Sequence, residues 1–222
     1  MKNVEEVIKE TVDNRALNHN VYPVYEIAKR IFDIVASITG IILLSPVFII
    51  TAILIKLTSK GPVIFIQERN GYKGKIFKMY KFRSMVVDAE ELLKHLEGKN
   101  EVSGHMFKIK NDPRTTKIGK FIRKTSIDEL PQLFNVLKGD MSMVGPRPPL
   151  VREVVNYDKW HNLRMSVKPG ITGLWQISKR NSVGFDEMVR LDLKYIRERN
   201  FWYDLKLILK TVPVIFGDNN AS

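Results

Sequence analysis

Two neighbouring carboxylates, Asp128 and Glu129, are the side chains of this 222-residue chain that best suit phosphate chemistry. They lie in the stretch TSIDELPQ, residues 125–132, directly after Arg123 and Lys124. Adjacent residues on a helix point ~100° apart, so the two carboxylates cannot do the same task on one ligand atom. They can divide the work: one attacks or coordinates in line while the other holds a Mg²⁺ ion.

The same stretch also fits a purely structural interpretation. Pro131 is tolerated in the first turn of a helix, which places both carboxylates at the N-terminus of a helix expected over residues 128–138. Ser126 followed by Glu129 matches a capping box, and Asp128 is an acceptable N-cap residue. Taken alone, this motif favours capping over catalysis.

Arginines in restricted surroundings supply further candidates. Arg147 lies between prolines in the segment GPRPP, residues 145–149, and Pro148 biases it to an extended conformation. A stiffened arginine can clamp an anion at low entropic cost, although a rigid surface turn is the alternative. Arg83, bracketed by apolar residues in KFRSM (81–85), can present a fixed guanidinium fork to a phosphate.

The charge balance points to an anionic partner. Lys and Arg total 36 against 24 acidic residues, a net charge of +12, and most of the excess lies between residues 60 and 124. Such a balance suits a nucleic acid, an anionic bilayer surface or a phosphorylated substrate. The chain has no cysteine, which excludes disulfides, Cys-ligated zinc and thiol nucleophiles, and its four scattered histidines argue against a His-rich metal site.

One apolar segment, residues 34–55, carries no charged side chain and is long enough as a straight helix, ~33 Å, to cross a bilayer. Ser45 and Pro46 stand at its middle, so we expect a break, with the freed carbonyls accepting hydrogen bonds from the Ser45 hydroxyl or from neighbouring protein. A re-entrant helix-break-helix returns both positive flanks to the cytoplasm; a proline-kinked transmembrane helix is the alternative. The flanking charges are Lys29, Arg30, Lys56 and Lys60.

Shorter elements are expected elsewhere. Residues 63–82 have a glycine-containing turn between two strand-like runs and predict a β-hairpin. The aromatic cluster at 201–203, beside lysines, suits either a helix in the headgroup layer or an anchor in the core. Helical periodicity covers residues 88–97, 185–199 and 203–216.

Taken together, these motifs resemble the small monotopic phosphoglycosyl transferases, also called bacterial sugar transferases or undecaprenyl-phosphate hexose-1-phosphate transferases. The matching blocks lie in the family's order between about Lys29 and Thr211, while residues 1–22 fall outside the match. They are KRIFD (29–33), the Ser45-Pro46 break, 61–77, KFRSM (81–85), 112–150 and PGITGLWQIS (169–178).

The resemblance implies roles for these residues. Asp128 would attack the sugar-bearing phosphate of a UDP-sugar, release UMP and carry a phosphosugar until polyprenyl (undecaprenyl) phosphate accepts it. Asp128 and Glu129 would also hold Mg²⁺. The residues implied to contact substrate are Lys81, Arg83, Arg123, Pro146, Arg147, Pro148 and Arg180. Those implied to fix the membrane helix are Lys29, Arg30, Ser45 and Pro46.

We therefore expect a helix-rich α+β fold at the cytoplasmic face of a bacterial inner membrane. An extension (1–28) would precede a re-entrant membrane helix (29–57) and a compact catalytic domain (58–222) with a small β-hairpin or sheet and interfacial amphipathic helices. Residues 29–222 would form one folding unit. The product would feed exopolysaccharide, capsule, O-antigen or other glycoconjugate assembly. The enzyme would be a minimal form, without the additional N-terminal membrane domain of the larger relatives.

Two other functions stay open from the residues alone. A membrane-tethered nucleic-acid-binding protein would use the net positive charge, but no helix-turn-helix, zinc or base-stacking signature supports it, and we expect no nucleic-acid partner. A non-catalytic membrane scaffold would use the carboxylates only as caps. Lys179 replaces a glycine common in the family, which bears on the loop of Arg180, and Ser84 replaces a threonine. The transferred sugar and the oligomeric state are not readable from the sequence.

Overall fold

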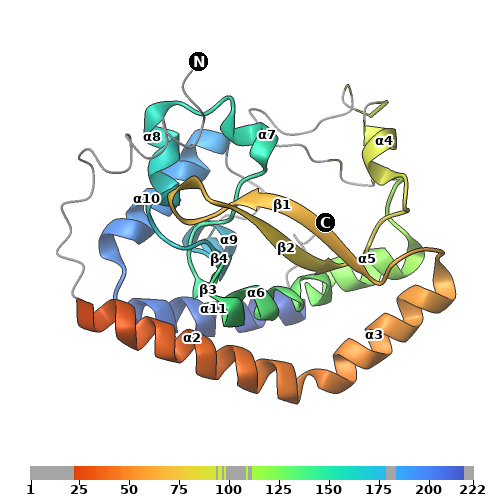
Figure 1. The fold of residues 1–222 in the computed structure, drawn as a ribbon, viewed down its shortest axis with the longest axis horizontal. Coiled ribbons are helices and arrows are strands. Elements are labelled where there is room, and N and C mark those ends of the chain that lie inside the picture. The colour runs from red at the N-terminus through yellow and green to blue at the C-terminus, as the bar shows by residue number, and fades with distance from the viewer. Residues whose placement is uncertain are drawn as a thin grey trace.

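The computed structural model describes residues 23–93, 95–96, 98, 109, 112–178 and 184–217, which form a helix-rich α+β fold (Figure 1). The α-helices are α2 (Pro23–Leu43), α3 (Ser45–Thr58), α4 (Ala89–Leu93), α5 (Lys117–Lys124), α6 (Gln132–Lys138), α7 (Val151–Val154), α8 (Lys159–Asn162), α9 (Leu174–Ser178), α10 (Phe185–Glu198) and α11 (Phe201–Gly217). The strands are β1 (Ile64–Asn70), β2 (Ile76–Phe82), β3 (Ser142–Val144) and β4 (Gly170–Thr172).

The expected β-hairpin is confirmed. Strands β1 and β2 pair antiparallel from Ile64 opposite Phe82 to Asn70 opposite Ile76. A short 3-10 turn joins them, and its left-handed Gly74 explains the glycine there. A second sheet, the parallel pair of β3 and β4, was not predicted, because strands of three residues carry too little alternation to be read.

The expected break in the apolar segment is also confirmed. Helices α2 and α3 meet at Leu44 and are bent by 60°, and they form the lower edge of the molecule in Figure 1. The Ser45 hydroxyl donates a 2.8 Å hydrogen bond to the Ile42 carbonyl, the group that Pro46 leaves without its helical donor. Among the described residues no single helix is long and apolar enough to cross a membrane, and the pair meets that test only together.

Helix α2 faces the rest of the protein with its polar side. Lys29, Asp33 and Ser37, four residues apart, are all buried. Lys29 Nζ lies 2.5 Å from Asp204 Oδ2 on α11, and Asp33 Oδ1 accepts hydrogen bonds from the Ser142 hydroxyl and the Met143 N–H of β3. The exposed apolar residues of α2 include Ile27, Ile31, Val35, Ile38 and Ile42. This is the reverse of a helix packed on a water-soluble protein. The helix begins at Pro23, six residues before the expected boundary at 29.

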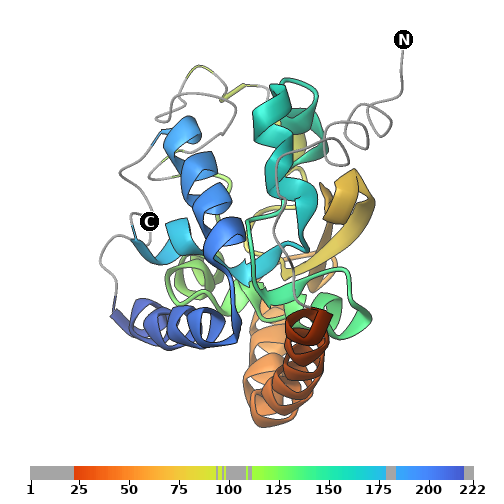
Figure 2. The ribbon, with the colours of Figure 1, turned by 90° about the vertical axis from the view of Figure 1, so that its left-hand side faces the viewer.

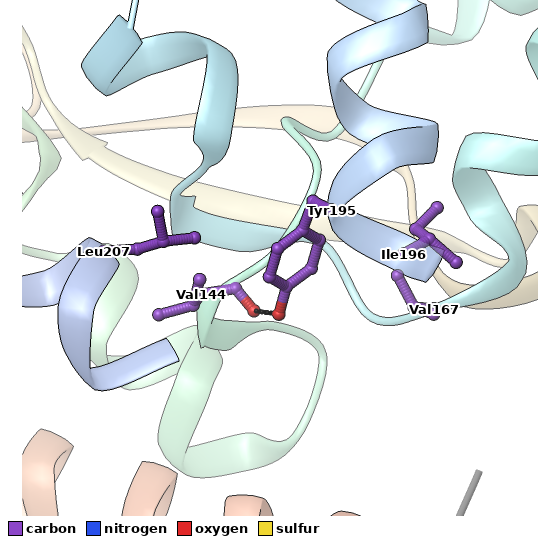
Figure 3. Close-up of a cluster of buried hydrophobic side chains, with 5 residues drawn as sticks. All are labelled: Val144, Val167, Tyr195, Ile196 and Leu207. Carbon is purple, nitrogen blue, oxygen red and sulfur yellow. Dashed lines mark hydrogen bonds between the residues drawn. The ribbon is translucent and has the colours of Figure 1, made fainter. Parts of the chain in front are cut away.

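A buried cluster joins β3 to the two C-terminal helices (Figure 3). Val144 of β3 packs with Tyr195 and Ile196 of α10 and with Leu207 of α11. The Tyr195 hydroxyl donates to the Val144 carbonyl at 3.1 Å and lies 2.8 Å from Asp204 Oδ1. The turned view in Figure 2 shows α11 on the same lower side of the molecule as the bent pair α2–α3. Strand β3 is therefore fixed by α2 and by the C-terminal helices at once.

The buried Lys29–Asp204 pair predicts an asymmetric response to mutation. Lys29→Met alone leaves the Asp204 carboxylate buried without its cation and should lower the free energy of unfolding by about 3–5 kcal/mol. The double variant Lys29→Met with Asp204→Asn removes both charges, keeps one oxygen that can accept from Tyr25 or Tyr195, and should recover most of that loss. Guanidinium titrations of the detergent-solubilised protein measure both values. A double variant no more stable than Lys29→Met would contradict this account.

Candidate active site

The carboxylate pair occupies a 3-10 turn, Ile127–Glu129, rather than the first turn of an α-helix. The expectation of one helix over 128–138 is therefore wrong at its start, because α6 begins only at Gln132, after Pro131. Ser126, just before the turn, has a left-handed backbone (φ 55°) and makes no side-chain capping hydrogen bond. The capping box is not formed, so the structural alternative for this motif loses its main support.

Asp128 is buried and poorly compensated. Its exposed fraction is 8%, and among the described residues no other side chain hydrogen-bonds to its carboxylate. Burial raises the pKa of the Asp128 carboxyl to about 6, with the positive charge of Lys81 opposing this and the negative charge of Glu129 adding to it. At neutral pH the group is an ionised carboxylate with little solvation, a state that favours nucleophilic attack.

Glu129 is paired with a lysine from the hairpin. Lys81 Nζ donates to Glu129 Oε1 at 2.9 Å, and both side chains are partly exposed. The fully buried Asn135 on α6 holds the strand that carries Lys81. Its amide donates to the Lys78 carbonyl at 2.7 Å and accepts from the Tyr80 N–H at 3.0 Å. Asn135 thus binds the backbone of β2 to α6 one residue before Lys81.

The segment Pro146–Pro149 follows β3 and has three prolines, so it can donate few backbone hydrogen bonds of its own. Each of its four carbonyls nevertheless accepts a hydrogen bond from elsewhere in the chain. The pairs are Gly170 N–H to Pro146 (2.9 Å), Arg164 Nη2 to Arg147 (3.2 Å), Arg69 Nη1 to Pro148 (2.9 Å) and Asn70 N–H to Pro149 (3.0 Å). The backbone of Arg147 is therefore fixed on both sides.

A buried ion pair, Arg164 with Asp192, contacts this segment through the Arg147 carbonyl. Arg164 contacts Asp192 of α10 through Nη2 and donates to the Tyr157 hydroxyl at 3.2 Å. Both members of the ion pair are almost completely buried. Burial raises the pKa of Asp192 to about 6 although the charge of Arg164 opposes the shift. The pair thus supplies a buried donor for the Arg147 carbonyl at a considerable electrostatic cost.

A shallow cleft brings these groups together, and its lining includes predicted and unpredicted residues. Lys81, Arg147 and Pro148 were expected to contact substrate, and Glu129 was expected to be a catalytic and metal-holding residue. Pro146 is buried one residue before Arg147, and Asp128 is adjacent to Glu129 in the chain. The complete lining is Arg69, Met79, Lys81, Glu129, Gln132, Arg147, Pro148, Gly170, Ile171 and Gln176.

The structure places two of the predicted arginines differently. Arg83 donates to the Lys60 carbonyl, to the Ser59 carbonyl at 3.0 Å and to the Ser59 hydroxyl at 2.7 Å, so it closes the C-terminal end of α3 rather than lining the cleft. Arg123 is exposed, donates to Thr115 Oγ1 at 3.2 Å and lowers the pKa of Asp128 through its charge. The segment that contains Arg180 lies outside the described residues.

Sequence reasoning missed Arg69, Arg164 and Gln132. The available signal was the position of Arg69 within the matched block 61–77, directly before Asn70 and the hairpin turn. The residues around Arg69 in the sequence did not indicate that it lines the same cleft as the distant Arg147.

The carboxylate pair is the part of the site that fits Mg²⁺. Among the residues that the structure describes, no group of three or more His, Cys, Asp or Glu side chains forms a ready-made metal site. Mg²⁺ is commonly held by one or two carboxylates together with substrate phosphates and water. Asp128 and Glu129 match that donor set only if a phosphate completes it, which ties any metal to the bound substrate.

A buried carboxylate beside fixed guanidinium groups is an arrangement that suits phosphate esters. The chain belongs to the bacterial sugar transferase family, whose sequence model matches residues 24–218. It is 55% identical over 196 residues to the galactosyl transferase CpsE of Streptococcus agalactiae, covering 88% of this chain and 43% of that protein.

Two further relatives show the range of lengths. The chain is 46% identical over 198 residues to the undecaprenyl-phosphate galactose phosphotransferase of Salmonella typhimurium, covering 87% of this chain and 41% of that protein. It is 38% identical over 199 residues to the exopolysaccharide production protein ExoY of Rhizobium meliloti, covering 88% of each. The chain thus spans less than half the length of the first two relatives but most of the third.

The buried charge of Asp128 predicts that Asp128→Asn stabilises the protein. The native carboxyl has a pKa near 6, above the unfolded value near 4, so the cost of its ionisation appears between these pH values and is complete above pH 6. Asp128→Asn should raise the free energy of unfolding by about 1–3 kcal/mol at pH 8 and by little at pH 4. Denaturant titrations across this range test it. Asp88→Asn, at an exposed position, should have no such effect. If Asp128→Asn and the wild type were equally stable at every pH, the burial argument would be contradicted.

Proposed function

We propose that this chain transfers a hexose-1-phosphate from a UDP-sugar to polyprenyl (undecaprenyl) phosphate and releases UMP. The observation that carries the proposal is the Asp128 carboxylate, buried and without a side-chain hydrogen-bond partner among the described residues, next to a cleft that contains Arg147 and the Lys81–Glu129 pair. The names of the Streptococcus and Salmonella relatives, a galactosyl transferase and a galactose phosphotransferase, support it.

The reaction divides into two displacements at one phosphorus atom. In the first, an Asp128 carboxylate oxygen forms a bond to the sugar-bearing phosphorus, and the bond from this phosphorus to the bridging oxygen breaks, so UMP leaves with the electron pair. In the second, an oxygen of polyprenyl phosphate attacks the same phosphorus and the bond to Asp128 breaks. The carboxylate is regenerated and the product is a polyprenyl-diphosphosugar.

The surrounding groups reduce repulsion between the reacting anions. A diphosphate donor and a phosphate acceptor repel each other, and a covalent intermediate lets them use one site in turn. Arg147 and Lys81 offset the negative charge that develops on the phosphoryl oxygens. A Mg²⁺ ion held by Asp128 and Glu129 would supply Lewis-acid neutralisation of those oxygens when bound.

We infer that the bent pair α2–α3 is a re-entrant membrane helix at the cytoplasmic face. The support is its outward apolar surface, its buried polar stripe and the 60° bend at residue 44. Helix α11 lies on the same side of the molecule as the pair and exposes Trp202, Leu209 and two lysines, Lys206 and Lys210, a composition that suits the headgroup layer. This placement keeps the site at the depth of the acceptor's phosphate.

Nucleotide analysis tests the reaction. The protein, incubated with radiolabelled UDP-sugars, Mg²⁺ and undecaprenyl phosphate, should release UMP, and Asp128→Asn should retain less than about one thousandth of that activity. The wild-type rate should rise with pH through about 6 as Asp128 ionises. Release of UDP would indicate ordinary glycosyl transfer, and full activity of Asp128→Asn would exclude the covalent mechanism.

Cysteine labelling tests the topology, and the absence of native cysteine makes it direct. Single cysteines introduced before Lys29 and after Lys60 should react with a membrane-impermeant maleimide only from the cytoplasmic side of oriented vesicles. Reaction of the two positions from opposite sides would replace the re-entrant arrangement with a proline-kinked span.

A further inference from the structure

Arg69, at the end of β1, is a buried cation whose partners are all neutral. Its exposed fraction is 6%. It donates to Gln67 Oε1 through Nε (3.1 Å) and Nη2 (2.7 Å), and to the Pro148 carbonyl through Nη1 (2.9 Å). Within the described part of the chain it forms no salt bridge. These contacts use three of its five N–H groups, which leaves two for another acceptor.

Two of the three other buried arginines are paired with carboxylates, whereas the third, Arg83, binds carbonyls and a hydroxyl group at the end of α3. Arg114 pairs with Asp112 at 2.6 Å, and Arg164 pairs with Asp192. A buried charge without a counter-ion is strongly unfavourable. The pKa of Arg69 is accordingly lowered to about 9, first by burial and next by the nearby charge of Arg147. The charges of Glu153 and Glu129 oppose this shift without reversing it, so the protein's own carboxylates compensate the Arg69 guanidinium only in part.

The position of Arg69 indicates where that anion lies. Arg69 and Arg147 line the same cleft, and Arg69 holds the carbonyl of Pro148, the residue that follows Arg147. Among the described residues the Arg147 side chain has no ion-pair or hydrogen-bond partner, whereas the third cation of the cleft, Lys81, is paired with Glu129. Two guanidinium groups therefore line one cleft, and among the described residues neither forms an ion pair with a carboxylate; Glu129, which lines the same cleft, pairs with Lys81.

We propose that Arg69 is a substrate-binding residue which, together with Arg147, binds the diphosphate of the nucleotide-sugar donor. This inference rests on the proposed function. Both substrates carry phosphate, but two adjacent guanidinium groups match two linked phosphates better than the single phosphate of the acceptor. Gln67 and Pro148 orient the guanidinium of Arg69, so its two remaining N–H groups act as a preorganised fork.

Three variants separate binding from folding. Arg69→Gln removes the charge but keeps an N–H donor for the Pro148 carbonyl, and Arg69→Lys keeps the charge without the fork. Lys78→Gln removes one exposed charge from the same hairpin and controls for net charge. Thermal unfolding of each protein in detergent is measured with and without UDP, which carries the donor's diphosphate without the sugar.

We expect UDP to raise the melting temperature of the wild type and of Lys78→Gln equally. Arg69→Gln should lose most of that shift, and Arg69→Lys should keep a larger part of it. Without UDP, Arg69→Gln should be at least as stable as the wild type, because a buried charge that is compensated only in part has been removed. A structural role predicts the opposite: a less stable unliganded protein with an unchanged response to UDP.

Steady-state kinetics distinguish the two phosphate-bearing substrates. Arg69→Gln should raise KM for the UDP-sugar by about 10- to 100-fold, the loss expected of hydrogen bonds to a charged group, and leave KM for undecaprenyl phosphate nearly unchanged. A rise confined to the acceptor would overturn the assignment to the donor.

The two proposals fail in different ways. If the wild type releases UMP from a UDP-sugar while Arg69→Gln binds UDP and donor normally, the reaction stands and the role of Arg69 is wrong. If UDP stabilises the wild type through Arg69 but no UMP is released, the diphosphate site stands and the transfer reaction is wrong.

Discussion

Helix α2 directs its charged side chains into the protein. The carboxylate turn before α6 and the arginine segment after β3 both depend on these side chains. Arg30 donates to the Val136 and Leu137 carbonyls at the end of α6, the helix that follows the carboxylate pair. Asp33 accepts from the backbone and side chain of β3, the strand that leads to Arg147. Since one helix holds both α6 and β3, the relative position of the catalytic turn and the arginine segment is set by the element that we place in the membrane.

Much of the electrostatic cost in this protein is concentrated at the site. Asp128 is ionised in a buried position, Arg69 is buried without an ion-pair partner among the described residues, and Ser126 holds a left-handed backbone that non-glycine residues seldom adopt. Each of these lowers the stability of the unliganded fold. Deviations of this kind are expected where a protein must meet charges that only its substrate brings. Other buried charges are paired, such as Lys29 with Asp204 and Arg164 with Asp192.

The sequence predicted features that depend on local chemistry. Pro46 cannot donate the helical hydrogen bond to Ile42, which predicts the break, and a glycine-containing turn between strand-like runs predicts the hairpin. Features that depend on distant partners were out of reach. Nothing local in the sequence shows that Lys29 and Asp33 face inward, because their partners lie over a hundred residues away. Arg83 looked like an anion clamp because its neighbours are apolar, yet α3 supplies carbonyls that occupy its guanidinium. The late start of α6 depends on the backbone of Ser126, which its residue type does not indicate.

Proline rings restrict the φ angles of the segment Pro146–Pro149, but they also prevent it from joining a regular ladder. Its four carbonyls accept hydrogen bonds from the hairpin, from the turn after α8 and from β4. A peptide of this sequence would keep the restricted φ angles but would lack all four of these hydrogen bonds. The geometry around Arg147 is thus acquired only when residues on both sides of it in the sequence have assembled.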